Sequence, residues 1–239
     1  MYFEHDAALW RDFPALVPGL LFVDGITPEV AVDAQVARFN RRAEARLASG
    51  TESEQPEIQA WRRTFAAMGL KPTQYRCASE SLLRRFRKDG ELPTLHPLVD
   101  LCNAVSLAYA TPVAVFDVAN ITSYVRVRYA TGDEEYLTFA GDTEHPAAGE
   151  VIFADEAGQA HARRWTNRQS ALSAVKDSTS AVLIVAEAMH ASAAADVPEL
   201  LEAIAGELDA LWSVRPTAAV LTPDSPRFSF GTELARYGN

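Results

Sequence analysis

Residues 164 to 168 place an aromatic ring among cationic and amide side chains. This tract holds Arg164, Trp165, Asn167 and Arg168. An indole offers a stacking surface, and guanidinium groups offer charge-assisted hydrogen-bond donors. Such a set suits a carboxylate, a phosphate or an adenine ring. The alternative is a tryptophan that closes the edge of a sheet while the arginines stay in solvent.

A polar amide stands inside an otherwise apolar segment at Asn103. Apolar residues recur at steps of three or four over residues 96–110, which predicts a buried helix. A buried amide is costly unless it is paired. Asn103 therefore either faces a pocket, where it pairs with a ligand, or bonds to a neighbouring carbonyl and fixes the helix.

Positive charge is concentrated in residues 61–90, which hold eight Lys or Arg against Glu80 and Asp89. The whole chain has a net charge of −10, which disfavours indiscriminate nucleic-acid binding, and we expect no DNA partner. A basic segment on an acidic body suits a local phosphate contact. The alternative is a solvated helix face whose charges pair with nearby carboxylates. The candidate RNA-contact residues are Arg76, Arg84, Arg87, Lys88 and Arg164.

Several common catalytic and binding signals are absent. The chain has no G-x-S-x-G, G-x-x-x-x-G-K or G-x-G-x-x-G motif. Its five histidines and its two cysteines, Cys77 and Cys102, show no metal-ligand spacing, so we expect neither a metal nor a cofactor. No apolar run of about 18 residues occurs, and residues 1–10 do not resemble a signal peptide. We expect a cytoplasmic protein with no membrane partner.

Hydrophobic periodicity predicts the elements that position these residues. Thr27 and Pro28 would cap the first helix, and Asp196 with Glu199 would form a capping box for the last, with Pro198 in its first turn. The expected helices span 28–48, 57–68, 79–90, 96–110 and 196–212. The expected strands span 17–26, 113–118, 125–130, 135–141, 149–155, 159–165, 180–188 and 216–222, with 180–188 central because it is apolar on both faces. This order indicates an α+β (mixed α/β) fold, a central mixed sheet with flanking helices.

Four stretches between about residues 58 and 189 carry a resemblance. They are YRCASESLLRR, HPLVDLCNAVSLAYATPVAVFD, GEVIFADEAG, and RRWTNRQS followed by SAVLIVAE. The region resembles the B3/B4 domain of the bacterial phenylalanyl-tRNA synthetase β subunit, in the form found as a free-standing protein. With the sequence pattern, this predicts a B3/B4-like domain with a C-terminal helix and strand over residues 58–222, a strand–helix elaboration over 1–57 and a tail over 223–239 without clear pattern.

In the synthetase this domain is an editing module that hydrolyses tyrosine wrongly attached to the phenylalanine tRNA. The resemblance therefore implies an amino-acid-sized pocket near a place for the tRNA acceptor end. Asn103 matches an asparagine that lines the editing pocket. We accordingly expect Asn103 to face a cavity bounded by residues 111–117, 165–170 and 185–187.

This chain departs from the synthetase pattern at three places. The synthetase has a histidine where Ala114 stands, and a glutamate that selects the tyrosine hydroxyl where Val185 stands. Glu187 follows two residues later, on the same face of the expected strand. A Gly-rich tract is replaced by residues 165–170. The pocket should therefore be more apolar than that of the synthetase, and should discriminate tyrosine weakly unless Glu187 supplies the acceptor.

Three functions remain open from the sequence. The first is a trans-editing deacylase that hydrolyses the ester of a mischarged aminoacyl-tRNA, with an unknown amino acid as substrate and unknown catalytic residues. The second is a non-catalytic module that binds an amino acid or a tRNA end. The third is an enzyme that acts on a free amino acid or a derived metabolite. The candidate substrate-binding residues are Asn103, Ala114, Trp165, Asn167, Arg168, Val185 and Glu187.

Overall fold

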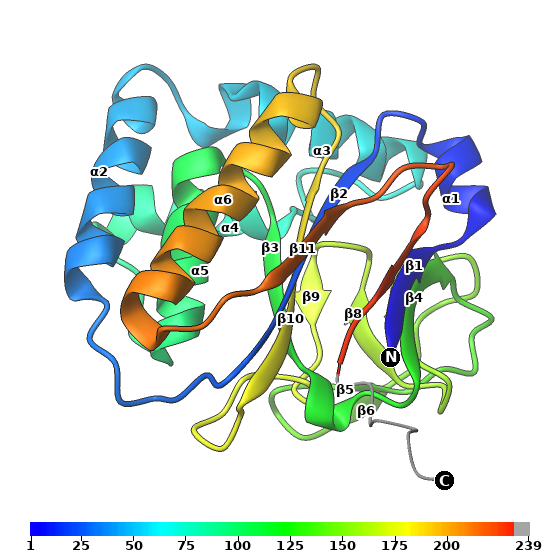
Figure 1. Cartoon of the computed structure of the whole chain (residues 1–239). Coiled ribbons are helices and arrows are strands. Elements are labelled where there is room, and N and C mark those ends of the chain that lie inside the picture. Colours follow the sequence, from blue (N-terminus) through cyan, green and yellow to red (C-terminus); the bar gives the residue numbers. More distant parts are fainter. Residues whose placement is uncertain (232–239) are drawn as a thin grey trace, which may run out of the picture.

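The computed structural model describes residues 1–231, which form two facing sheets with helices against one of them (Figure 1). The helices are α1 (Ala7–Asp12), α2 (Asp33–Ala48), α3 (Pro56–Ala67), α4 (Ala78–Asp89), α5 (Pro97–Tyr109) and α6 (Ala193–Trp212), with short 3-10 turns at Glu52–Glu54 and Val118–Asn120. In the described part of the chain no helix is both long enough and apolar enough to cross a membrane.

One sheet has the strand order β11-β2-β10-β3 and the other the order β12-β1-β4-β7-β8-β9. A further pair, β5 and β6, stands apart. Strands β1 and β4 pair in parallel, whereas the pairs β1–β12 and β4–β7 are antiparallel, so the larger sheet is mixed. The strands are β1 (Tyr2–His5), β2 (Val17–Asp24), β3 (Val113–Asp117), β4 (Tyr124–Tyr129), β5 (Tyr136–Leu137), β6 (Thr143–Glu144), β7 (Val151–Ala154), β8 (Ala160–Arg163), β9 (Arg168–Gln169), β10 (Ala181–Ala188), β11 (Thr217–Val220) and β12 (Arg227–Ser229). The predicted α+β fold with a mixed sheet and flanking helices is confirmed.

Strand β10 divides the interior into two cores, because successive side chains of a strand point to opposite faces. Val182, Ile184 and Ala186 face a core shared with α2, α5 and α6. Leu183 and Val185 face a second core, shared with β1, β4, β7 and β8. As predicted, β10 is central: it lies between β2 and β3.

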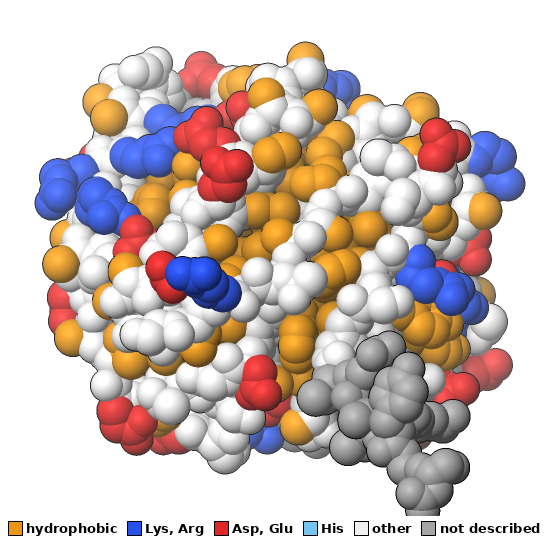
Figure 2. Space-filling model, viewed as in Figure 1, with side chains coloured by type: hydrophobic (Ala, Val, Ile, Leu, Met, Phe, Trp, Pro, Cys, Tyr) orange, Lys and Arg blue, Asp and Glu red, His pale blue; other side chains and the backbone are white. Residues whose placement is uncertain are grey.

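Helix α6 approaches β2 closely at Gly19. A Cβ atom built there would lie 2.5 Å from a Val197 side-chain carbon, so only glycine fits this crossing. On the face of the molecule that carries α6 and β11, apolar side chains of these two elements lie along the centre and charged side chains lie towards the rim (Figure 2).

Two predicted helix starts are wrong. Helix α2 begins at Asp33 and not at Thr27–Pro28, because Val30 and Val32 are spaced at two and do not continue the helical period. Helix α6 begins three residues earlier than the predicted capping box, since alanines favour the helix and extend it. Asp196 lies inside the first turns and accepts hydrogen bonds from His190 and Ser192.

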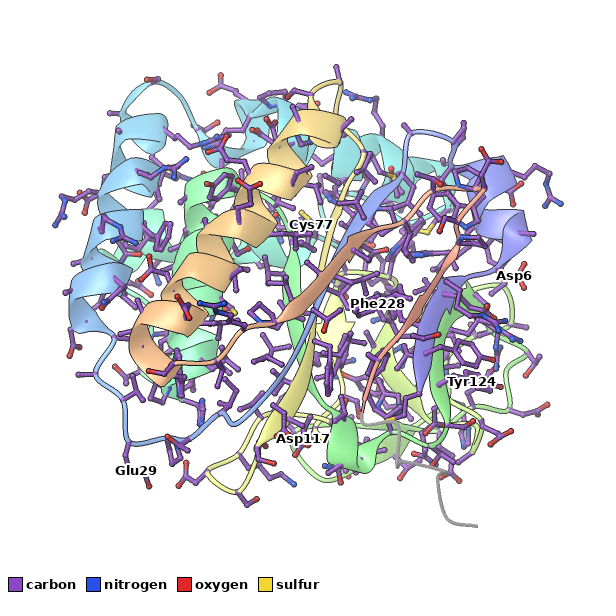
Figure 3. The ribbon with its side chains drawn as sticks, viewed as in Figure 1. Asp6, Glu29, Cys77, Asp117, Tyr124 and Phe228 are labelled. Carbon is purple, nitrogen blue, oxygen red and sulfur yellow. The ribbon has the colours of Figure 1, made fainter. Side chains whose placement is uncertain are left out.

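The chain ends are more ordered than the sequence pattern indicated. Strand β1 and helix α1 were not predicted, although Asp6 caps α1 by accepting a hydrogen bond from the Ala8 N–H. The predicted tail contains β12, which pairs with β1 and buries Phe228 (Figure 3). The rest of that tail, residues 232–239, lies outside the described residues. Of the predicted strand 135–141, only Tyr136–Leu137 forms a strand, which pairs with β6, while Glu135 makes an isolated bridge to Gln159.

Candidate functional site

A cavity of about 70 Å³, here called the inner cavity, lies between the two sheets. Its apolar wall comes from β3, β7, β8 and β10, through Ala114, Phe153, Ala162 and Val185. Its polar lining is Glu187 and the segment 166–169, where the partly exposed side chains lie. Six of the seven predicted substrate-binding residues line this one cavity: Ala114, Trp165, Asn167, Arg168, Val185 and Glu187.

Glu187 is buried and holds several segments together. Its carboxylate oxygens lie 2.6 Å from Nε2 of His5 and 3.0 Å from the donating indole Nε1 of Trp165. Its backbone carbonyl accepts a hydrogen bond from the Trp61 indole at 3.3 Å. As predicted, Glu187 lies on the same strand face as Val185. The acceptor proposed for a ligand is therefore already engaged by two protein donors, although a carboxylate can accept more than two hydrogen bonds.

Arg164 and Trp165 form a tight turn between β8 and β9, with φ values of 47° and 56°. Residues other than glycine rarely adopt this left-handed backbone conformation. The Trp165 N–H donates to the Val151 carbonyl at 2.8 Å, and the Arg164 N–H donates to the Glu150 carboxylate at 2.9 Å. These bonds and the burial of the indole hold a backbone shape that glycines would adopt without strain.

Trp165 does not offer the stacking surface that the sequence suggested. Its side chain is fully buried, and it packs edge-on against Phe13 and Trp61 with ring centroids 5.0 and 5.4 Å apart. Both contacts join segments far apart in sequence, which is why the tract alone did not reveal this burial. The prediction of an exposed stacking platform at Trp165 is wrong.

The segment after this turn is fixed to the start of α4 and leaves one polar group free. Asn167 donates its side-chain amide to the Arg76 carbonyl at 2.7 Å, and the Thr166 carbonyl accepts from the Ala78 N–H at 2.8 Å. Thr166 lines the cavity, and its hydroxyl oxygen is buried and has no hydrogen-bond partner within residues 1–231. Buried hydroxyls are normally paired, so Thr166 is a candidate ligand contact that sequence reasoning missed.

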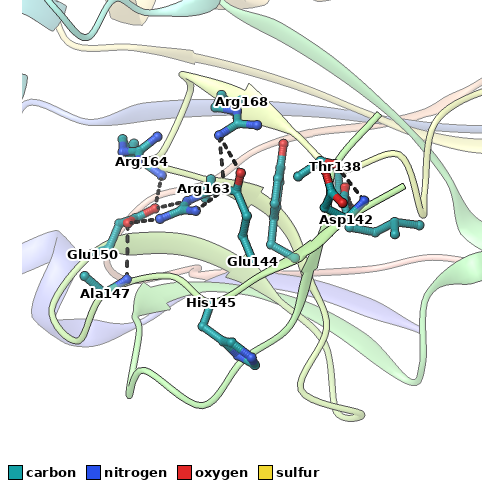
Figure 4. Close-up of polar contacts among 12 residues, drawn as sticks. Thr138, Asp142, Glu144, His145, Ala147, Glu150, Arg163, Arg164 and Arg168 are labelled. Carbon is teal, nitrogen blue, oxygen red and sulfur yellow. Dashed lines mark hydrogen bonds and ion pairs between the residues drawn. The ribbon is translucent and has the colours of Figure 1, made fainter. Parts of the chain in front are cut away.

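Charged side chains surround the outer end of this segment (Figure 4). Arg163 pairs with Glu144 and Glu150, and Arg168 reaches Glu144 at 3.1 Å. Burial opposes ionisation of Glu150, but the Arg163 guanidinium more than offsets it, so the pKa of Glu150 lies below its usual range. The guanidinium of Arg164 lies over the Tyr75 ring, 4.8 Å from its centroid.

Asn103 does not line the inner cavity. It lies on α5, against the helix-covered face of the smaller sheet, whereas the inner cavity lies on the opposite face. Asn103 instead lines two wider hollows, one of about 330 Å³ bordered by Leu95, Phe139 and Gln169, and one of about 350 Å³ bordered by α2. The predicted shared cavity with residues 185–187 is wrong, because strand β3 stands between them.

The predicted RNA-contact residues on α4 pair with carboxylates. Arg84 and Arg87 lie 4.0 and 2.8 Å from the buried carboxylate of Glu52, and Lys88 lies 3.7 Å from Asp89. Arg76 lies 3.5 Å from the buried Glu80. These pairs match the alternative of a helix face neutralised by nearby acids. Phosphate contact by this face stays a prediction.

The chain brings one histidine into a cluster that its sequence spacing did not indicate. Ligand atoms of Glu57, His190 and Asp196 lie within 4.8 Å of one another. His190 Nε2 is 2.7 Å from the Asp196 carboxylate, and the Arg46 guanidinium already pairs with Glu57 at 2.6 Å. The Arg46 guanidinium therefore already supplies a positive charge to this cluster.

Comparison with known proteins places this site in a family. The B3/4 domain model matches residues 60–198. Over 93 residues the chain is 32% identical to a phenylalanine–tRNA ligase beta subunit of Cereibacter sphaeroides, covering 39% of this chain and 11% of that one. Over 140 residues it is 24% identical to the corresponding subunit of Haemophilus influenzae, covering 58% and 18%. The chain thus spans less than a fifth of these relatives.

A crystal structure of an N-terminal fragment of the phenylalanyl-tRNA synthetase beta subunit from Pyrococcus horikoshii aligns with a TM-score of 0.43 at 8% identity. The alignment covers 92% of this chain and 54% of that one. The predicted resemblance to the beta subunit is confirmed by the sequence matches. Because the family match extends over more than half of the chain and includes all residues that line the inner cavity, the protein belongs to the B3/4 domain family.

Proposed function

We propose that the protein hydrolyses the ester of a mischarged aminoacyl-tRNA, with the side chain of the amino acid held in the inner cavity. The observation that carries this proposal is the cavity itself. It combines apolar walls, the buried Glu187 carboxylate and Thr166, whose hydroxyl has no partner among residues 1–231, all within the family match. The relatives named above are tRNA ligase subunits, which makes a tRNA-linked amino acid the favoured ligand.

Each part of an aminoacyl ester has a complementary group in this site. The apolar wall of Ala114, Ala162 and Val185 suits a side chain. The Glu187 carboxylate retains lone pairs that can accept from the α-ammonium group. Arg168, which is partly exposed at the mouth, suits the phosphates that follow the terminal ribose.

The reaction needs a positioned water molecule and an oriented ester. The water oxygen bonds to the ester carbonyl carbon, the bond from that carbon to the ribose oxygen breaks, and a proton from the water passes to the ribose oxygen. The products are the free amino acid and the tRNA. We assign to the Thr166 hydroxyl the donation of a hydrogen bond to the carbonyl oxygen as negative charge develops there.

A panel of tRNAs, each charged with a different amino acid, tests the proposal. The protein should release the amino acid from at least one of them. Thr166→Val, which removes the hydroxyl and keeps the shape, should lower that rate about a hundredfold. Thr143→Val, on β6 and exposed, should not. Release from no charged tRNA would contradict the proposed hydrolysis, and release that Thr166→Val leaves unchanged would contradict the role of Thr166.

A binding module is the second candidate, favoured by the chemistry of the lining. Glu187 is engaged by His5 and Trp165, and no serine or cysteine lines the cavity in the described part of the chain. Nearby Cys77 is buried, and burial raises the pKa of its thiol to about 12. Saturable binding of a charged tRNA without release of its amino acid would favour this candidate. Stabilisation by a free amino acid alone would favour an enzyme or sensor of that metabolite.

A further inference from the structure

Gln169 forms a partition between the inner cavity and the hollow that Asn103 lines. Its side chain borders both spaces, as does Val113. The Gln169 side-chain amide donates to the Val115 carbonyl at 2.7 Å. Because β3 is an edge strand of its sheet, no strand of residues 1–231 lies beyond it to pair with that carbonyl. The hydrogen bond therefore fixes the glutamine across the gap between β9 and β3.

This partition leaves a small inner space. The inner cavity measures about 70 Å³, whereas the hollow beyond Gln169 measures about 330 Å³. An apolar cavity of roughly 150 Å³ accommodates benzene. The inner cavity is about half that size, so a methyl or isopropyl group fits it and an aromatic ring does not.

We propose that the inner cavity selects aminoacyl esters with small aliphatic side chains, from alanine to valine, and that Gln169 sets the upper size limit. This inference rests on the proposed ester hydrolysis. It assigns a specificity-determining role to a residue that makes no charge pair and was not among the predicted site residues. Shortening Gln169 would join the inner cavity to the hollow bordered by Phe139 and Asn103, which gives room for a ring.

Rates of deacylation on tRNAs charged with alanine, valine, phenylalanine or tyrosine test the size limit. The wild-type protein should favour the small side chains by about tenfold or more. Gln169→Ala should raise the rates on the aromatic esters about tenfold and so remove the preference. Gln159→Ala is the matched control, because that side chain bonds to Glu135 at the surface, away from the cavity. It should keep the wild-type ratio.

Two results would overturn the size limit while the proposed hydrolysis stands. One is a wild-type protein that hydrolyses the aromatic esters best. The other is a folded Gln169→Ala variant, with a melting temperature near that of the wild type, whose preference is unchanged.

A second experiment tests the size of the inner cavity even when no charged tRNA is hydrolysed. Xenon and benzene are added in turn while the indole N–H resonance of Trp165 is followed by NMR. Xenon should shift this signal in the wild-type protein and benzene should not, whereas both should shift it in Gln169→Ala. A benzene-induced shift in the wild-type protein, or no response to xenon, would contradict the proposed cavity size.

Discussion

At the scale of single residues, Glu187 joins segments that the sequence keeps far apart. His5 comes from β1, Trp165 from the turn after β8 and Trp61 from α3, and all three bond to this one residue. The carboxylate also borders the inner cavity. A ligand that reached the cavity would therefore meet a carboxylate whose position is fixed by protein donors.

Replacing Glu187 tests whether this residue stabilises the fold as well as lining the cavity. Glu187→Ala leaves the His5 imidazole and the Trp165 indole N–H buried without an acceptor, and should lower the free energy of unfolding by about 3 to 5 kcal/mol. Glu187→Gln keeps one acceptor and should lower it by about 1 to 2 kcal/mol. Glu202→Ala, exposed on α6, should change it by less than about 0.5 kcal/mol. Urea denaturation measures all three, and an Ala variant as stable as the wild type would refute the network.

The tract 164–168 shows which features of the site could be predicted. Residue types and the resemblance correctly grouped Trp165, Asn167 and Arg168 around a cavity. The burial of Trp165 could not be read from the tract, because it depends on Phe13 and Trp61, far away in the chain. The role of Gln169 was equally hidden, because it depends on the unpaired edge of β3.

At the scale of elements, helix periods predicted which segments are helical better than where they begin. The apolar spacing of α3, α4 and α5 located all three within a few residues. The start of α6 was missed because Asp196 and Glu199 fit a capping pattern that the preceding alanines override. Strand β12 was missed because its pairing partner, β1, lies at the opposite end of the chain.

Helix α4 allows a test of the predicted RNA contact that spares its closest pair with Glu52. Arg87 is unsuitable because it closely pairs with the buried Glu52. The double change Arg84→Glu and Lys88→Glu removes more exposed charges, so tRNA affinity should fall and its dependence on salt should flatten by about 0.7 to 0.9 in logarithmic slope per lost contact.

The matched control for α4 carries the same charge change on α2 and after α6, as Arg41→Glu with Arg215→Glu. Filter binding over a range of salt concentrations measures both double variants. If the control weakens tRNA binding as much as the α4 variant does, only net charge matters and α4 is not the contact face.

At the scale of the whole molecule, the N-terminal segment is part of both sheets. Strand β1 pairs with β4 and β12, and β2 pairs with β10 and β11. Residues before the family match thus complete the two layers that enclose the inner cavity, and they supply His5 to Glu187. The sequence predicted β2, but it gave no sign that the first strand reaches the site.

Acid stability should depend in part on Glu134. Burial opposes ionisation of this carboxylate, but hydrogen bonds from the Thr131 N–H and from Arg128 outweigh it and lower its pKa from 4.5 to about 2. A lowered carboxyl pKa stabilises the fold above the unfolded value, and this contribution is lost as the pH falls from about 4.5 to 2. After allowance for screening by solvent, Glu134→Gln should therefore lower the free energy of unfolding by about 1 to 2 kcal/mol at pH 7 and by little near pH 2.

Urea denaturation at several pH values checks this dependence on Glu134. Asp133→Asn, at the exposed neighbouring position, should keep the wild-type dependence on pH. A Glu134→Gln variant whose unfolding free energy differs from that of the wild type by the same amount at pH 7 and pH 2 would rule out the assigned linkage.

The most direct test of the account follows the four tryptophan indole N–H signals by NMR as a non-hydrolysable valyl-amide analogue of the 3′-terminal adenosine is added. If the inner cavity is the ligand site, the signals of Trp165 and Trp61, both bonded to Glu187, should shift and saturate together. The signal of Trp212, which donates to the Thr27 carbonyl beside α6, should stay in place. Saturable binding that moves the side-chain amide of Asn103 and leaves Trp165 unchanged would place the ligand in the outer hollows and contradict the account.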